Sequence, residues 1–109
     1  MLKKESTEIH VAAINDSEII GILLLKPEEN QKIKMRQVAV KPEWQGLGMG
    51  KKLVKFAEKV ALKKGFFTIE LNARNTAVYF YLSLDYNTIG NEFLEVGIPH
   101  IKMFKNLKH

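Results

Sequence analysis

The chain has 109 residues, of which 46% are hydrophobic and 27% charged, and its 17 basic and 12 acidic residues give a net charge of +5. It contains no cysteine, which excludes disulfides, thiolate metal sites and an acyl-cysteine intermediate. Its longest apolar run, Ile19 to Leu25, is much shorter than the about 20 residues of a membrane-spanning helix. These features predict that residues 1–109 form a single domain that stays out of membranes and lies in the cytoplasm.

The first third of the chain predicts three β-strands. Residues 8–14 and 18–25 are rich in apolar and β-branched side chains, and the Asn15-Asp16 pair between them is a hairpin signal. Residues 27–31 are polar and turn-like, and a third strand is expected over residues 33–40. The chain therefore starts with a hairpin followed by a further strand.

A helix is expected over about residues 48–64, and Gly65 is a suitable residue to end it. Its apolar residues recur at helical spacing and share one predicted face. They are Met49, Leu53, Phe56, Ala57, Val60 and Ala61. Residues 67–72 form the next strand, and a strand, a helix and a strand in this order predict a parallel pair with a right-handed crossover.

A second, shorter helix is predicted after that strand, with Asn75 as its N-cap. Its apolar face consists of Ala77, Phe80, Tyr81 and Leu84. Residues 86–96 are expected to be extended, Gly97 and Pro99 turn the chain, and residues 100–104 form a last strand. The sequence therefore predicts an α/β fold with a mixed sheet, in the order β-β-β-α-β-α-β-β, around a central parallel β-α-β unit.

Glycines alternate through residues 46–50, at the junction between the third strand and the first helix. They let backbone N–H groups approach a ligand closely, and the start of a helix favours an anion such as phosphate. Two familiar phosphate-binding loops do not fit the spacing. A Walker loop needs a glycine at Gln45 and a hydroxyl residue at Lys52, and a dinucleotide fingerprint needs its third glycine at Lys51.

Two segments carry a family resemblance. The first, Gln45-Gly46-Leu47-Gly48-Met49-Gly50, fits the pattern Q/R-x-x-G-x-G/A. The second, residues 72–86, reads Asn-Ala-Arg-Asn-Thr-Ala-Val-Tyr-Phe-Tyr-Leu-Ser-Leu-Asp-Tyr. In both segments and in the order of its elements, the chain resembles the GNAT superfamily of acyl-CoA-dependent N-acetyltransferases over residues 8–107. It departs from the family pattern at Asp85, where members usually have glycine.

The resemblance implies that acetyl-CoA is the acyl donor and that coenzyme A binds at these two segments. The backbone of Val38, Ala39 and Val40 would pair with the pantetheine arm. The pyrophosphate would be held by the backbone N–H groups of Gln45, Gly46, Leu47, Gly48, Met49, Gly50 and Lys51. Asn72, Asn75 and Tyr81 complete the set of residues that the resemblance assigns to the donor site.

Tyr81 matches the family's tyrosine near the cofactor sulfur, and the resemblance gives it the role of hydrogen-bonding the departing thiolate. Core packing alone also explains an aromatic residue at this position. Reference pKa values of about 10 for tyrosine and about 8.5 for a thiol make complete proton transfer unfavourable by roughly 2 kcal/mol. Tyr81 is therefore expected to stabilise developing charge more than to protonate the sulfur.

An acceptor amine must lose a proton to react, and many relatives use a glutamate on the strand before the glycines. Residues 35–37 are Met-Arg-Gln here, so another base is needed. His100 is the first candidate because its unperturbed pKa lies near neutrality, although it could equally be a surface or hydrogen-bonded histidine. Glu92 and Glu95 are the next candidates and also possible acceptor contacts. Arg36 could recognise an acidic acceptor or simply face solvent.

The sequence thus predicts an enzyme, an N-acetyltransferase that moves an acetyl group directly from acetyl-CoA to an amine of a small molecule or a protein. The histidines have no metal-ligand spacing, so no metal is expected. Family members usually begin with a strand and one or two helices that wall the acceptor pocket, but almost nothing precedes Glu8. We therefore expect a minimal member or a homodimer whose partner subunit supplies that wall.

Two other functions stay open. A non-catalytic acyl-CoA-binding module would hold the donor without transferring its acyl group. A small basic nucleic-acid-binding domain is less expected, because Phe56 is the one aromatic residue among the six lysines of residues 51–64. Those lysines also fit a solvated helix face, with Lys51 and Lys52 placed to attract an anionic cofactor. Nucleic acid is therefore not an expected partner.

Overall fold

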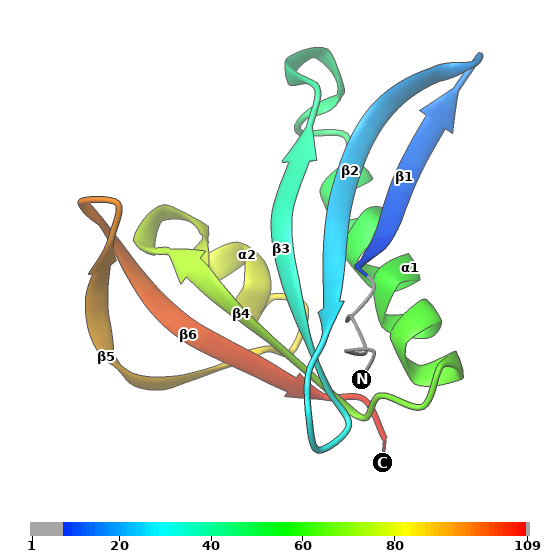
Figure 1. Cartoon of the computed structure of the whole chain (residues 1–109). Coiled ribbons are helices and arrows are strands. Elements are labelled where there is room, and N and C mark those ends of the chain that lie inside the picture. The colour runs from blue at the N-terminus through cyan, green and yellow to red at the C-terminus, as the bar shows by residue number, and fades with distance from the viewer. Residues whose placement is uncertain (1–7, 109) are drawn as a thin grey trace, which may run out of the picture.

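A computed structural model describes residues 8–108, which contain a six-stranded mixed sheet with the strand order β1-β2-β3-β4-β6-β5 (Figure 1). The strands are β1 (Ile9–Asn15), β2 (Glu18–Pro27), β3 (Lys32–Val40), β4 (Thr68–Arg74), β5 (Asn87–Glu95) and β6 (Ile98–Asn106). The helices are α1 (Met49–Lys63) and α2 (Val78–Leu82), preceded by the 3₁₀ turns η1 (Pro42–Trp44) and η2 (Asn75–Ala77). The predicted fold class and order of elements are confirmed.

Both helices cover the same face of the sheet, behind the strands in Figure 1, and the core lies between them and this face. On β4, for example, Ile69, Leu71 and Ala73 are buried in this core. The residues between them belong to the opposite face, because side chains alternate along a strand. No helix in residues 8–108 covers that opposite face, and none there is long and apolar enough to cross a membrane.

The apolar face of α1 differs from the predicted one. Leu53, Val54, Ala57 and Ala61 are buried, whereas Phe56 is 57% exposed. At about 100° per residue, the stripe through Leu53, Val54 and Ala57 turns Phe56 away from the sheet. The prediction that Phe56 shares the buried face is therefore wrong, and Val54 takes that place.

The β1–β2 hairpin turns one residue later than predicted. Asn15 pairs with Glu18, so the two turn residues are Asp16 and Ser17, with φ of 49° and 67°. Two successive residues with positive φ form the turn type that matches the twist of a two-residue hairpin. Ser17 therefore belongs to the turn, and Asn15 to the strand.

The central strands β3 and β4 are parallel but pair over a short stretch. Lys32, Ile33 and Lys34 pair with Thr68, Ile69 and Glu70, and the strands then separate. In the separated part of β3, Gln37 has a φ of 54° and lies where the pairing with β2 shifts register between Ile22 and Leu24. Such a bulge bends a strand, and bulges are frequent beside binding sites.

The segment around α2 also departs from the prediction. Asn75 is the first residue of η2, the cap of η2 is Arg74, and no side chain caps either element. The prediction that Asn75 is an N-cap is therefore wrong. After α2, Asp85 has a φ of 71°, the left-handed conformation that the usual glycine would adopt without strain.

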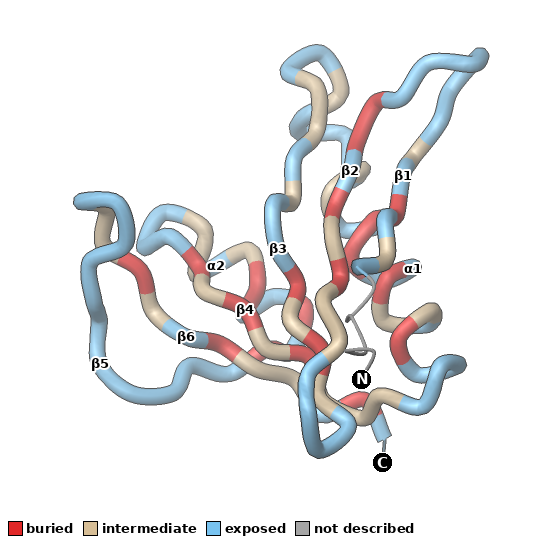
Figure 2. Tube along the Cα trace, in the orientation of Figure 1, coloured by how far each residue is buried: buried red, intermediate tan, exposed pale blue. Residues whose placement is uncertain are grey.

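Strand β5 is exposed along its whole length and forms an edge of the sheet (Figure 2). Its pairing with β6 is irregular between Ile89 and Phe93, around Gly90. Leu94 is 73% exposed, and Val96 in the turn after the strand is 93% exposed. This end of the sheet therefore presents apolar side chains and an unpaired strand edge to solvent.

Candidate functional site

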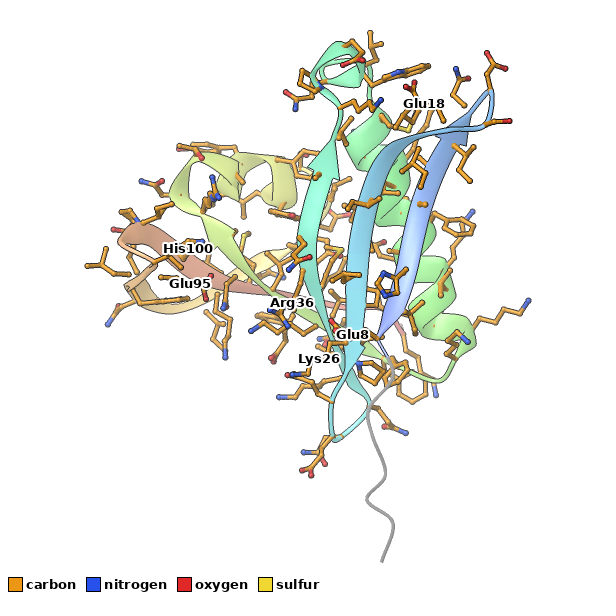
Figure 3. The ribbon with its side chains drawn as sticks, turned by 45° about the horizontal axis from the view of Figure 1, so that its top comes forward. Glu8, Glu18, Lys26, Arg36, Glu95 and His100 are labelled. Carbon is orange, nitrogen blue, oxygen red and sulfur yellow. The ribbon has the colours of Figure 1, made fainter. Side chains whose placement is uncertain are left out.

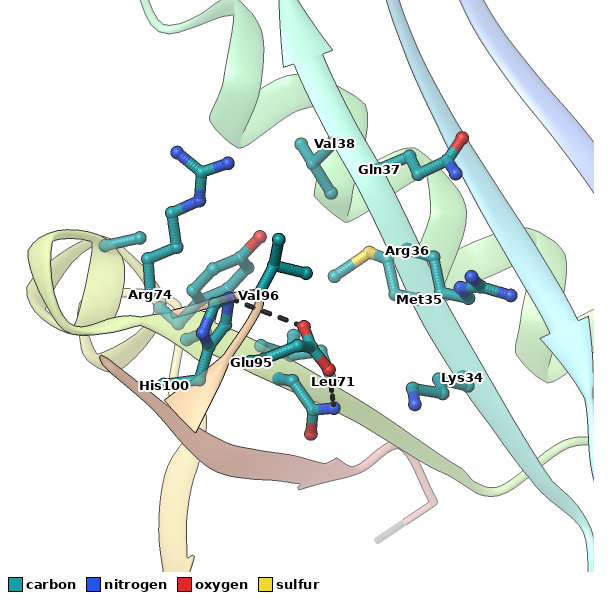
Figure 4. A pocket seen from close by; sticks show the side chains of 14 residues that line it. Lys34, Met35, Arg36, Gln37, Val38, Leu71, Arg74, Glu95, Val96 and His100 are labelled. Carbon is teal, nitrogen blue, oxygen red and sulfur yellow. Dashed lines mark hydrogen bonds and ion pairs between the residues drawn. The ribbon is translucent and has the colours of Figure 1, made fainter. Parts of the chain in front are cut away.

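A cavity of about 640 Å³ opens where β3 and β4 separate. Residues 34–38 of β3 form one wall, and residues 71–74 of β4 form the other. Tyr81 of α2 and the Glu95, Val96 and His100 side chains of the β5–β6 hairpin complete the lining. In Figure 4 the hairpin residues and Arg74 stand opposite the side chains of β3.

Tyr81 lies on this cavity and is 7% exposed. Its ring packs edge-to-face against Phe80 and Tyr86, with centroid separations of 5.0 and 5.6 Å. Burial raises the pKa of Tyr81 to about 12. The hydroxyl is therefore protonated at neutral pH. Because no group in residues 8–108 hydrogen-bonds it, its O–H can donate to a ligand.

The ring of Tyr86, which packs against Tyr81, is held in place by a hydrogen-bond network. Its hydroxyl donates to Oε2 of Glu58 on α1 at 2.9 Å, and Lys105 of β6 donates to Oε1 of the same carboxylate at 3.0 Å. Burial, followed by the charge of Glu58, raises the pKa of Tyr86 well above its usual value. This network ties α1, β6 and the end of the α2 segment together behind the cavity.

His100, 7% exposed, is held by two neighbours. Its Nδ1 lies 2.7 Å from the carbonyl oxygen of Ile98 and must carry a proton, because a carbonyl only accepts. Its Nε2 lies 3.5 Å from Oε2 of Glu95, and the ring of Phe93 stacks against it. The imidazole is therefore oriented with Nε2 toward the carboxylate of Glu95.

Asn72 extends this group along β4. Its Nδ2 donates to Oε1 of Glu95 at 3.3 Å, while its Oδ1 is buried without a hydrogen-bond partner in residues 8–108. An unpaired buried acceptor costs about 1–3 kcal/mol. Asn72 lines the cavity, but this oxygen itself is enclosed by the protein.

The glycine segment forms a second part of the site, at the start of α1. Gly46 and Gly48 have φ of 78° and 79°, and Gly48 is the N-cap of the helix. No atom lies within 4 Å of a Cβ built at either glycine, so the backbone conformation, not lack of space, selects glycine here. The side chain of Gln45 donates to the carbonyl oxygen of Val40 at 2.9 Å and connects the loop to the end of β3.

The loop offers a row of unused donors. The N–H of Gln45 donates to Pro42, but none of the N–H groups from Gly46 to Lys51 donates to a protein group in residues 8–108. Unpaired N–H groups at a helix start attract anions, and the α1 dipole strengthens that attraction. These residues therefore fit a phosphate group, with the free donors beginning at Gly46.

The cavity collects several of the residues that the sequence singled out. Arg36, Val38, Asn72, Tyr81, Glu95 and His100 line it. Ala39 and Val40 lie beyond its β3 wall, next to a smaller hollow against β2. Glu92, in the irregular part of β5, and Asn75 are not among its lining residues.

Sequence reasoning missed Lys34, Arg74 and Val96 as lining residues. Lys34 could have been found, because it alternates with Arg36 on the same face of β3. Arg74 and Val96 carried no comparable signal, since their positions depend on where β4 and the β5–β6 turn end. No cluster of metal-ligating side chains occurs among residues 8–108.

Comparison with known proteins identifies the family. A model of the acetyltransferase (GNAT) domain matches residues 1–107. The uncharacterized N-acetyltransferase YjcF of Bacillus subtilis (strain 168) is 35% identical over 74 residues, covering 67% of this chain and 53% of YjcF. The chain spans about half the length of the curated relatives it matches first.

Solved structures with the same architecture include two coenzyme A complexes. PaiA N-acetyltransferase from Thermoplasma acidophilum superposes with a TM-score of 0.79 and 24% identity, over 91% of this chain and 60% of that one. An aminoglycoside 6′-N-acetyltransferase superposes with a TM-score of 0.80 and 21% identity, over 94% of this chain and 74% of that one. At these identities the likeness concerns the fold.

Proposed function

The chain belongs to the GNAT acetyltransferase family, and from this premise we propose that it transfers an acetyl group from acetyl-CoA directly to the nitrogen of an amine. The observation that carries the proposal is the cavity between the separated strands β3 and β4, which has Tyr81 in its lining. The free N–H groups from Gly46 to Lys51 lie beyond the end of β3 and suit the phosphates of the donor. Coenzyme A in two structures of the same fold supports this choice.

The donor site would use backbone groups for most of its contacts. The N–H groups from Gly46 to Lys51 would bind the pyrophosphate, with Lys51 adding positive charge. The edge of β3 that faces β4, which is unpaired at Val38 to Val40, would hydrogen-bond the pantetheine arm as an added strand does. Asn72 and Asn75, on the β4 side, are the proposed side-chain contacts.

Tyr81 would act on the leaving group. As the amine nitrogen bonds to the acetyl carbon, the carbon–sulfur bond breaks and its electron pair stays on sulfur. With a pKa of about 12 in Tyr81 against about 8.5 for a thiol, full proton transfer would be uphill by about 5 kcal/mol. Tyr81 would therefore donate a hydrogen bond to the thiolate without giving up its proton.

The His100–Glu95 pair would take the proton of the amine. Glu95 is the more exposed member, with 47% of its side chain accessible, whereas His100 is enclosed. The amine would therefore meet the carboxylate first, and His100, fixed by the carbonyl of Ile98, would share the proton. A lysine-like amine with a pKa of about 10.4 needs such a base at neutral pH.

Release of free thiol from acetyl-CoA tests the proposal, measured over a panel of small amines with coenzyme A binding followed by calorimetry. We expect thiol release that depends on an amine and yields the N-acetylated product by mass spectrometry. Coenzyme A binding without thiol release for any amine would instead support a non-catalytic binding module. Absence of coenzyme A binding would reject both.

We also propose that two copies of the chain associate. Support comes from the exposed apolar residues at the β5 edge, above all Leu94 and Val96, beside the cavity. A solution mass measured by light scattering should correspond to a dimer, and Leu94→Asp should shift it to the monomer. A monomeric parent with full activity would refute this. A cytoplasmic location stays a prediction from the sequence.

A further inference from the structure

Three positive side chains line the cavity. Arg36 extends from β3 (Figures 3 and 4), Lys34 lies two residues before it, and Arg74 stands at the end of β4 (Figure 4). Glu95, on the hairpin opposite β3, is the one carboxylate of the lining. From this arrangement we propose that the acceptor is a small amine that also carries an anionic group, a carboxylate or a phosphate. This inference rests on the proposed acetyl transfer.

Lys34 and Arg36 are too far from the glycine segment to serve the donor pyrophosphate. A strand rises about 3.3 Å per residue, so Arg36 lies about 13 Å and Lys34 about 20 Å before Val40, where the loop begins. Both residues belong to the part of β3 where the pairing with β4 ends, at the Lys34–Glu70 pair. The reactive end of an extended donor arm that starts at the loop would reach this region, where the acceptor must bind.

No carboxylate of residues 8–108 forms an ion pair with Lys34, Arg36 or Arg74. The ion pairs of Lys and Arg within residues 8–108 are Lys32–Glu70, Lys41–Glu18 and Lys105–Glu58. A ligand anion can therefore pair with these side chains without breaking an existing contact.

The carboxylate of Glu95 sets the orientation of the acceptor. Asn72 and His100 hold it from two sides, at 3.3 and 3.5 Å, so its position is fixed. The amine would approach the Glu95 carboxylate, which Asn72 and His100 hold in place. The anionic end would then face Lys34 and Arg36 on β3, where a guanidinium can bind a carboxylate or phosphate through two hydrogen bonds.

Matched pairs of amines test this inference through thiol release from acetyl-CoA. One pair is 4-aminobutyrate and butylamine, another is O-phosphoethanolamine and ethanolamine, and putrescine serves as a dication. We expect kcat/KM to be at least about ten-fold higher for the anionic member of a pair, as one charged hydrogen bond predicts. Equal or better turnover of butylamine, ethanolamine or putrescine would overturn the inference.

Arg36→Gln should lower kcat/KM for the preferred anion-bearing amine about 10- to 100-fold and leave kcat/KM for the partner amine without the anionic group nearly unchanged. Lys26→Gln is the control, because it removes one positive charge from β2 outside the cavity. An unchanged preference in Arg36→Gln would contradict the proposal. If no amine releases thiol, calorimetry of 4-aminobutyrate and O-phosphoethanolamine on the coenzyme A-saturated protein tests the anion site independently of the acetyl transfer. Binding that Arg36→Gln weakens would support the anion site. Absence of binding would reject it.

Discussion

Tyr81 and Tyr86 pack edge-to-face, with ring centroids 5.6 Å apart and planes at 69°, but their hydroxyls differ in hydrogen bonding. The hydroxyl of Tyr86 donates to Glu58, whereas Tyr81 lines the cavity and has no hydrogen-bond partner in the described chain. One tyrosine is thus committed to the structure, and its neighbour keeps a free donor. This difference separates the effects expected from changing each of them.

Tyr81→Phe should lower kcat about ten-fold or more, while the affinity for coenzyme A barely changes, because the lost hydrogen bond forms only as the thiolate leaves. Steady-state kinetics and calorimetry measure the two quantities. Tyr79→Phe is the matched control on the same helix, since that side chain is 83% exposed and outside the cavity. If Tyr81→Phe turns over at the parent rate, Tyr81 has no catalytic role.

Stability should fall steeply in alkali. Both tyrosines have raised pKa values in the folded protein, with Tyr81 at about 12, so the unfolded chain ionises first. Their contribution to the free energy of unfolding is complete below about pH 10. Above that pH it falls by on the order of 1 kcal/mol per pH unit for each tyrosine. Urea unfolding at a series of pH values measures the slope. Tyr86→Phe should make it shallower, and an unaltered slope would show that another group causes the loss.

Glu58→Gln should destabilise the protein by about 2–3 kcal/mol, because the side chains of Glu58 and Lys105 are only 14% and 19% exposed and Lys105 would lose its counter-charge. Urea unfolding gives the difference. In comparison, Glu18→Gln breaks an ion pair with Lys41 whose side chains are 54% and 40% exposed, and should cost less than about 1 kcal/mol. Similar losses in the two variants would contradict the role of the buried network.

Gly48→Ala should lower stability by about 1–2 kcal/mol, since alanine is strained at a φ of 79°. It should also weaken coenzyme A binding, because relief of that strain would move the N–H groups at the start of α1. Gly50→Ala is the comparison: its Cβ would make an ordinary contact of 3.5 Å with Phe80, and alanine favours a helix by up to about 1 kcal/mol. Thermal unfolding and calorimetry check both variants, and a fully stable Gly48→Ala with unchanged affinity would refute the prediction.

The order of the elements could be predicted because alternating apolar residues and glycine punctuation act locally. The errors occur where packing decides. Phe56 fits a helical spacing, but the stripe that meets the sheet passes through Val54. Asn75 is a frequent capping residue, but the chain first forms the 3₁₀ turn η2 there.

The candidate site was predictable only in part for the same reason. Tyr81 and the glycine segment belong to continuous motifs, so the sequence could indicate them. The contact of His100 with Glu95 depends on a two-residue turn at Val96-Gly97, and the hydrogen bond from Asn72 to Glu95 depends on the same turn. Such relationships arise only after β5, β6 and β4 have paired.

The short pairing of β3 with β4 has a mechanical consequence. Strands β1, β2 and β3 with α1 make one half of the molecule, and β4, β6 and β5 with α2 make the other. Three residue pairs join them along the sheet, and the contacts of Glu58 with Tyr86 and Lys105 join them behind it. A ligand arm lying between the two strands would bridge these halves and restrict their relative movement. Amide hydrogen exchange should therefore slow on both sides of the cavity when the donor binds, including in residues that never touch it.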